Sequence, residues 1–134
     1  MHRRPHDMSF RDVGILANTD KVNAHEYDTL YEKYLQPLRH NPVRLLEIGL
    51  GCNMNYGPGH SLSLWTHYFT NKNSSVSFVE FDGVCANKHR ATIEEMGRGK
   101  LYVGDQAEDT FLDSIVAAET DSPFDIIIDD GAAR

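Results

Sequence analysis

Apolar residues recur at helical and strand spacings along most of the chain, and these spacings predict its secondary structure. Pro42 ends a predicted helix over Ala24–Arg39, and the compact apolar run Val43–Gly49 after it is typical of a strand. Residues 1–20 show neither period and are predicted to form an N-terminal extension. The apolar residues of the helix follow each other at steps of three and four, which places them on one face: Tyr27, Leu30, Tyr31, Tyr34, Leu35 and Leu38.

The alternation of strand, loop and helix then repeats. Turn-forming residues fill a loop from Gly51 to Gly59, and Ser61 is placed to cap the next helix, whose apolar side includes Trp65. Four strands alternating with helices predict an α/β fold, an open parallel sheet with helices on both faces. The apolar run Ile126–Ile128 favours a last strand covered on both faces. The later segments are strands at Ser75–Glu80, Lys100–Val103 and Phe124–Asp129, and helices at Val84–Met96 and Ala107–Glu119.

Size, charge and hydropathy make some classes of function and partner unexpected for this chain. A chain of 134 residues, 40% of them hydrophobic, is expected to form one globular domain at most. The formal net charge is −7 and the basic residues are scattered, so we expect no nucleic-acid partner. No apolar stretch has the length of a membrane span, and none follows the basic start as in a signal peptide. We therefore expect no membrane partner and a cytoplasmic location.

The two cysteines, Cys52 and Cys85, lie far apart and belong to no CxxC or Cys/His ligand spacing. This spacing argues against a disulfide scaffold and against a structural zinc site, and a reducing compartment fits it best. Cys52 falls in a polar loop, where no residue near it in sequence would favour a thiolate.

Acidic residues stand at the end of every predicted strand. In open α/β sheets, ligands bind at the carboxyl ends of the strands where the strand order reverses, so these residues are predicted to converge on one crevice. Aspartate and glutamate also follow strands because they start turns and cap helices, and for each residue alone a structural role is equally expected. The positions are Glu47 near Gly49, Glu80 with Asp82, Asp105 with Gln106, and Asp129 with Asp130.

The first strand-to-helix connection contains Gly49 and Gly51, which is typical of a backbone that approaches a ligand closely. Met54 stands where the dinucleotide pattern GxGxxG has its third glycine, and a long loop follows, so tight pyrophosphate binding is disfavoured. An adenosine ligand without that group fits better, its ribose hydroxyls bound by an acid at the end of the second strand. Glu80 is the candidate for this acid, and Asp82 is the alternative.

Several short motifs occur in order from about Asn18 to Gly131. Together they resemble class I S-adenosylmethionine-dependent methyltransferases, and more narrowly the macrocin/mycinamicin O-methyltransferase type and its fungal relatives. The ordered set is far more specific than any one motif. It consists of Thr19-Asp20-Lys21 with His25, Tyr27 and Tyr31, then Leu46–Gly51, Gly59 with Ser61, Leu62 and Trp65, Gly104-Asp105-Gln106, and Phe124–Gly131.

The resemblance implies a role for each strand end. Glu47, Gly49 and Gly51 would line the methionine part of S-adenosylmethionine. Glu80 would hold the ribose, and Asp105 with Gln106 would border the adenine.

The last motif resembles the family's Asp-Asp-Gly-Ser/Gly-His sequence, whose carboxylate helps to bind magnesium and whose histidine is the candidate base. Asp129 and Asp130 would supply the magnesium ligands, and paired carboxylates suit such a hard cation. Ala133 stands at the histidine position, so no candidate base is present.

The family's Rossmann-like domain has seven strands, whereas this chain stops after the fourth. Residues 21–134 are therefore expected to be a partial methyltransferase domain from a truncated gene, an alternative transcript or a fragment. The first interpretation is an O-methyltransferase acting on a hydroxyl of a small molecule. A non-catalytic remnant that binds cofactor or a partner is the second, and a nicotinamide-dependent oxidoreductase is the third.

By resemblance the sheet order is third, second, first, fourth, which places Phe124–Asp129 at an edge. Its apolar residues would lie beside unpaired backbone groups, without the charges, prolines or bulges that protect natural edges. Self-association of the chain through this edge is the expected consequence.

Overall fold

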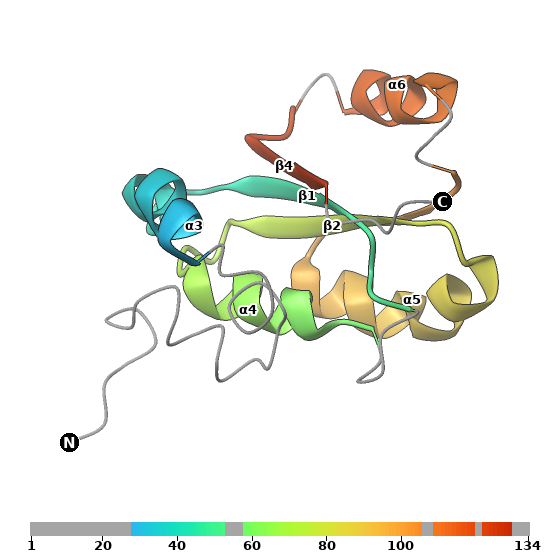
Figure 1. Cartoon of the computed structure of the whole chain (residues 1–134), viewed down its shortest axis with the longest axis horizontal. Coiled ribbons are helices and arrows are strands. Elements are labelled where there is room, and N and C mark those ends of the chain that lie inside the picture. Colours follow the sequence, from blue (N-terminus) through green and yellow to red (C-terminus); the bar gives the residue numbers. More distant parts are fainter. Residues whose placement is uncertain (1–27, 53–57, 106–108, 120–121, 130–134) are drawn as a thin grey trace.

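The computed structural model describes residues 28–52, 58–105, 109–119 and 122–129, in which helices and strands alternate (Figure 1). Each element lies where the sequence pattern predicts it, and the proposed extension, residues 1–20, lies outside the described residues. The elements in order are α3 (Asp28–Leu35), the 3-10 helix η2 (Gln36–Leu38), β1 (Arg44–Ile48), α4 (His60–Tyr68), β2 (Ser75–Glu80), α5 (Gly83–Gly97), β3 (Leu101–Val103), α6 (Asp109–Ala118) and β4 (Ile126–Asp129).

The four strands form one parallel sheet in the order β3-β2-β1-β4. The chain moves outward from β1 through β2 to β3, then returns to the other side of β1 for β4. At the carboxyl end of β1, Ile48 therefore lies between Val79 of β2 and Asp129 of β4. This topology confirms the predicted α/β class and strand order, and it places the reversal of strand order beside β1.

Helices cover both faces of the sheet, as predicted: α4 and α5 lie on one face and α6 on the other (Figure 1). The larger core is on the α4 and α5 face, where Trp65, Tyr68 and Phe78 are fully buried. The core under α6 is smaller and centres on Ile115. The prediction that Trp65 is a core residue is thus confirmed, and α4 is anchored by its aromatic side.

The helix ends differ from the predictions in two places. Gly59, with φ 93°, is the N-cap of α4, whereas Ser61 was expected to cap it and lies inside the first turn. Pro37 lies in η2, so the first predicted helix ends as a 3-10 turn before the strand. In the described ranges, no helix is long and apolar enough to cross a membrane.

The last strand is less covered than its apolar sequence predicts. Ile126 and Ile128 pack against the larger core, but Ile127 points to the opposite face and is 53% exposed. The expectation that β4 is covered on both faces is wrong for the described structure, because α6 packs on Leu46, Ile48 and Val79 instead. β4 forms one edge of the sheet, as predicted.

The cysteines are paired, which corrects the argument from their spacing against a disulfide. Cys52 and Cys85 form a disulfide across 33 positions of sequence, with a Cα–Cα distance of 6.1 Å. The pairing follows from the sheet, because β1 and β2 are parallel neighbours and the segments after them meet at the same edge. The sequence alone showed only the distance along the chain.

Arg44, at the start of β1, connects this strand to the residues before β4 and to the end of α6. Its backbone N–H donates to Asp125 Oδ2, and the N–H of Asp125 donates to the carbonyl of Arg44, each at 2.8 Å. The guanidinium lies over the Phe124 ring, 4.9 Å from its centroid, and its Nη2 is 3.0 Å from Glu119 Oε2. Glu119 also accepts a hydrogen bond from the Tyr102 hydroxyl. The end of α6 and the start of β4 are thereby attached to β1.

Glu119 is the buried carboxylate of this cluster, and we expect its charge to stabilise the fold. The hydrogen bond from Tyr102, helped by Arg44 and Lys100, lowers the pKa of Glu119 below its usual value, although burial opposes this shift. The stabilisation is present above the unfolded-state pKa and is lost as the pH falls through the lower folded-state pKa. Glu119→Gln should lower the free energy of unfolding at pH 7 by about 1–3 kcal/mol.

Urea unfolding at a series of pH values measures this effect. The difference between Glu119→Gln and the parent chain should shrink as the pH is lowered from 7 toward 3. Glu95→Gln, a matched change at an exposed position of α5, should change stability little at any pH. An equal loss in both variants would contradict the role assigned to Glu119.

Candidate functional site

The candidate site lies at the carboxyl end of the sheet, next to the point where strand order reverses. Four segments meet along this edge: the turn after β3, the turn after β2, the glycine loop after β1 and the end of β4. The sequence predicted this convergence, and the strand ends that the structure describes do lie side by side. The acidic residues, however, differ strongly in what they contact.

The glycine loop, Gly49–Cys52, adopts a backbone that only glycine accepts easily. Gly49 has φ 103° and Gly51 has φ 89°, a region that side chains with a Cβ rarely adopt. The N–H of Gly49 donates to the carbonyl of Val79 at 2.8 Å, which ties the loop to β2. Both positions thus favour glycine for their backbone conformation, and the predicted close approach to a ligand stays a prediction.

Glu80, the last residue of β2, joins the glycine loop to the turn that follows its own strand. Its Oε1 accepts from the N–H of Leu50 at 3.0 Å, and its Oε2 accepts from the N–H of Asp82 at 2.8 Å. The residue is buried, and each oxygen has a second lone pair for another donor. Glu80 is thus oriented before any ligand binds, with the capacity to accept further hydrogen bonds.

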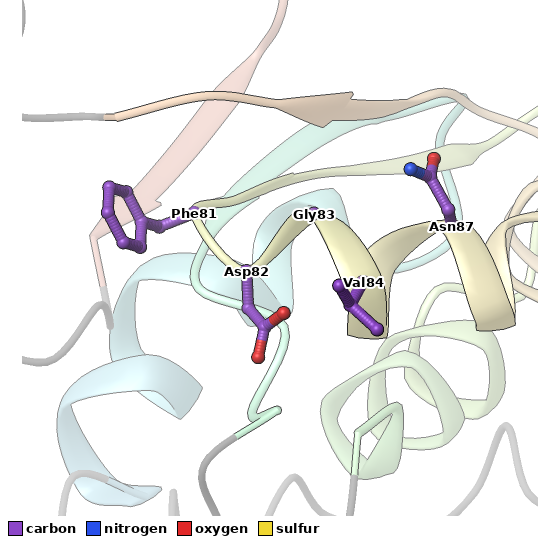
Figure 2. A pocket seen from close by; sticks show the side chains of 5 residues that line it. All are labelled: Phe81, Asp82, Gly83, Val84 and Asn87. Atoms are coloured by element: carbon purple, nitrogen blue, oxygen red, sulfur yellow. The ribbon is translucent and has the colours of Figure 1, made fainter.

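Asp82, the alternative acid, caps α5. Its Oδ1 accepts from the N–H of Cys85 at 3.1 Å, and the side chain is exposed. It also lines an open pocket of about 520 Å³ at the start of α5 (Figure 2). Phe81, at the end of β2, also lines this pocket; its ring projects away from Val84 and Asn87 (Figure 2), and the residue is 53% exposed.

The apolar part of this pocket was not predicted from the sequence. Besides Asp82, its lining consists of Phe81, Gly83, Val84 and Asn87. Val84 is 84% exposed, which is unusual for a valine in the first turn of a helix. The signal was present in the sequence, because two large apolar residues flank the Asp82–Gly83 turn directly after the proposed ribose acid.

Glu47 lies deeper than the other acidic residues. Its side chain is buried beneath α4, and its Oε1 accepts from the indole N–H of Trp65 at 2.6 Å. Trp65 in turn makes an edge contact with Tyr31, with ring centroids 5.9 Å apart. Glu47 therefore connects β1 to α4, and its role toward a ligand stays a prediction.

The turn after β3 reaches the same edge. The N–H of Gly104 donates to the carbonyl of Glu80 at 3.0 Å, so the turn lies beside the end of β2. A Cβ at Gly104 would come within 2.5 Å of the Phe111 ring, so this position leaves no room for a side chain. Asp105 follows and is partly buried, whereas Gln106 lies outside the described residues.

Asp129 ends β4 beside the glycine loop, because it pairs with Ile48 in the sheet. Its predicted partner Asp130 and the alanine at position 133 lie outside the described residues. Among the residues that the structure does describe, no group of three or more histidine, cysteine, aspartate or glutamate side chains is placed to hold a metal ion. The magnesium site therefore stays a prediction from the resemblance.

Comparison with known proteins finds O-methyltransferases among the relatives of this chain. The chain is 35% identical over 127 residues to 8-demethyl-8-(2-methoxy-alpha-L-rhamnosyl)-tetracenomycin-C 3'-O-methyltransferase of Streptomyces olivaceus. It is 33% identical over 112 residues to demethylmacrocin O-methyltransferase of Streptomyces fradiae, and 32% identical over 110 residues to mycinamicin VI 2''-O-methyltransferase of Micromonospora griseorubida. These O-methyltransferases are its homologues. The resemblance to the macrocin/mycinamicin type is confirmed.

The alignments cover most of this chain but a minor part of each relative. They include 90%, 82% and 81% of the chain, and 30%, 25% and 25% of the three relatives. The chain thus spans about 30% or less of the length of these proteins. No protein-family model matches it.

A solved structure agrees with the sequence relatives. The MycE methyltransferase from the mycinamycin biosynthetic pathway, solved in complex with Mg and SAH, superposes with a TM-score of 0.74 at 27% sequence identity. The match covers 97% of this chain and 32% of MycE. A second MycE structure, in complex with Mg, SAH and mycinamycin VI, matches at 26% identity with the same TM-score. The fold is therefore that of the Rossmann-like methyltransferases.

Proposed function

We propose that the chain forms the cofactor-binding part of an S-adenosylmethionine-dependent methyltransferase that acts on a hydroxyl of a small molecule. The observation that carries the proposal is the hydrogen bond between the glycine loop and Glu80, at the point where strand order reverses. The homologues of the chain are O-methyltransferases, which agrees with this site. The name of the Streptomyces olivaceus relative contains a rhamnosyl sugar, and MycE was solved with SAH. A sugar hydroxyl is accordingly the proposed acceptor.

The described residues fit an adenosine ligand. The positive φ angles of Gly49 and Gly51 allow backbone to lie directly against a ligand, and Glu80 is a preoriented acceptor for ribose hydroxyls. Phe81 and Val84 offer apolar surface next to that acid, which suits the face of a purine ring. Asp105 lies on the neighbouring strand end, where we propose that it borders the adenine together with Gln106.

S-adenosylmethionine, when bound, supplies a methyl group on a positively charged sulfur that an acceptor oxygen can displace in line. The task of the protein is to bind and orient, and to remove the acceptor proton. Glu80 and the glycine loop perform the binding. Glu47 and the glycines are proposed to face the methionine part, with Glu47 held in place by Trp65.

We further propose that Asp129 and Asp130 would hold a magnesium ion. The presence of Mg in the MycE complex and the Asp129-Asp130 sequence support this. Of these two residues, the described part of the chain contains Asp129. The cytoplasmic location expected from the sequence likewise stays a prediction.

A non-catalytic, cofactor-binding protein is the second candidate function. It is favoured by Ala133, which stands where the resembling motif has its candidate base. Loss of a general base typically lowers the rate by about 10²–10⁴-fold.

We expect the chain of 134 residues to show no methyl transfer above background with magnesium and hydroxylated natural-product acceptors. Transfer of a radiolabelled methyl group from S-adenosylmethionine measures it directly, with a full-length relative such as mycinamicin VI 2''-O-methyltransferase as the positive control. Product formation by this chain would show that another group acts as base.

Glu80 is expected to determine cofactor affinity. Glu80→Gln replaces the carboxylate, which accepts hydrogen bonds from the ribose hydroxyls, by a neutral amide. One of its two acceptor oxygens becomes an NH2 donor, and we expect a loss of about 1.5–3 kcal/mol of binding free energy. Titration calorimetry with S-adenosylhomocysteine should therefore show affinity lower by about 10- to 150-fold. NAD, titrated in parallel, should bind neither protein measurably.

Asp82→Asn is the matched control, because asparagine retains the oxygen that caps α5. It should leave the affinity for S-adenosylhomocysteine within about threefold of the parent, because aspartate and asparagine cap helices about equally well and the binding free energy should change little. The opposite ranking of the two variants would move the ribose role to Asp82. Circular dichroism during heating checks that both variants are folded.

We also propose that the chain associates with a second copy through β4, which is an edge strand with Ile127 53% exposed. Size-exclusion chromatography with light scattering should show a mass that rises with concentration. Ile127→Lys should shift the population toward monomer, whereas Val116→Lys, at a similarly exposed valine of α6, should not. A parent chain that stays monomeric throughout would contradict the proposal.

A further inference from the structure

The disulfide connects the two segments that form the proposed cofactor site. Cys52 ends the glycine loop after β1, and Cys85 lies in the first turn of α5, directly after β2. Both residues are partly buried, and Cys52 packs against the larger core. The covalent bond therefore lies where the ligand-binding edge of the sheet meets the core under α4 and α5.

Non-covalent bonds join the same two segments in parallel with the disulfide. Leu50, two residues before Cys52, donates its N–H to Glu80, and Glu80 accepts from the N–H of Asp82. Asp82 accepts from the N–H of Cys85, which returns to the disulfide. Glu80 thus belongs to a closed ring of contacts that joins the two segments. The disulfide is the covalent link of that ring between them.

The glycine loop depends on such a link more than an ordinary turn does. Two of its four residues are glycines at positive φ, and glycine loses more conformational freedom on ordering than any other residue. A crosslink removes part of that freedom before a ligand arrives, which lowers the entropic cost of binding. Leu50, between the glycines, is buried, and its N–H donates to Glu80, so a loss of order in the loop would act on this contact first.

We propose that Cys52 and Cys85 are a positioning pair for the cofactor site, and that their oxidation state sets its affinity for the adenosyl ligand. The inference rests on the proposed function. In the oxidised chain, the glycine loop is held against Glu80. In the reduced chain, the loop is released and Glu80 loses its fixed partner at Leu50.

The switching step is ordinary thiol–disulfide exchange with a dithiol reductant. One thiolate of the dithiol attacks one sulfur of the pair, the Cys52–Cys85 bond breaks, and the second thiol closes the dithiol into its own disulfide. Two electrons and two protons pass from the dithiol to the chain, which then carries two thiols. Reversal requires a disulfide-containing oxidant of the same chemical class.

The test compares the whole chain in its oxidised form and after reduction with dithiothreitol, with thiol titration to establish each state. Hydrogen–deuterium exchange should be about tenfold faster at the Leu50 amide in the reduced chain, a change of about 1.4 kcal/mol in local stability. The Phe78 amide, which donates to the Lys100 carbonyl inside the sheet, serves as the internal control and should not change. Calorimetry with S-adenosylhomocysteine should show affinity lower by about 5- to 50-fold after reduction, the range of ordinary coupling between sites.

The double variant Cys52→Ser/Cys85→Ser is the matched control for the reductant. It should exchange and bind as the reduced chain does, with or without dithiothreitol. If this variant does not fold, the comparison of oxidised and reduced parent chain decides alone.

Each of the other possible results contradicts one part of the proposal. Two titratable thiols in air-oxidised chain, or equal Leu50 exchange in both states, would overturn the positioning role. Altered exchange with unchanged affinity would overturn the link to the cofactor. Absence of S-adenosylhomocysteine binding in both states would refute the proposed function itself, and the Leu50 exchange would then still decide whether the pair positions the loop.

Discussion

The parallel pairing of β1 with one neighbour on each side is the constraint on which the rest of the structure depends. Leu45 and Leu46, adjacent in β1, each have 1% of their surface exposed and belong to different cores, so this strand supports both layers of helices. Burial of each such side chain contributes about 1.5–3 kcal/mol. The same pairing holds the end of β1 between two other strand ends, so the glycine loop starts between the ends of β2 and β4.

Features with a local cause were predictable from the sequence. The strands, the helices and the need for glycine at positions 49 and 51 all follow from periodicity or from the backbone of a few adjacent residues. The contact of Leu50 with Glu80 spans 30 positions and the disulfide spans 33, and both depend on the register of two strands. Spacing along the chain contains no information about that register, and it therefore could not predict that Cys52 and Cys85 form a disulfide. The exposure of Ile127 depends in the same way on where α6 packs.

Three acidic residues that look alike in the sequence have different tasks in the structure. Glu47 accepts from an indole under α4, Asp82 caps α5, and Glu80 holds two backbone amides from different segments. All three lie at or near the end of a strand, so the sequence could place them at one edge but could not separate their roles. Their structural roles also make the edge rigid, and a rigid edge is what a small ligand requires for tight binding.

The start of β4 is attached to β1 by contacts outside the strand pairing itself. Two hydrogen bonds join Arg44 to Asp125, and the Arg44 guanidinium lies over the Phe124 ring. These contacts fix the register in which β4 pairs with β1, with Leu45 opposite Ile126 and Ile48 opposite Asp129. Because successive side chains of a strand point to opposite faces, a shift of β4 by one residue would turn Ile127 toward the larger core and Ile126 and Ile128 away from it. The cluster around Arg44 therefore also decides which isoleucines of the last strand are buried.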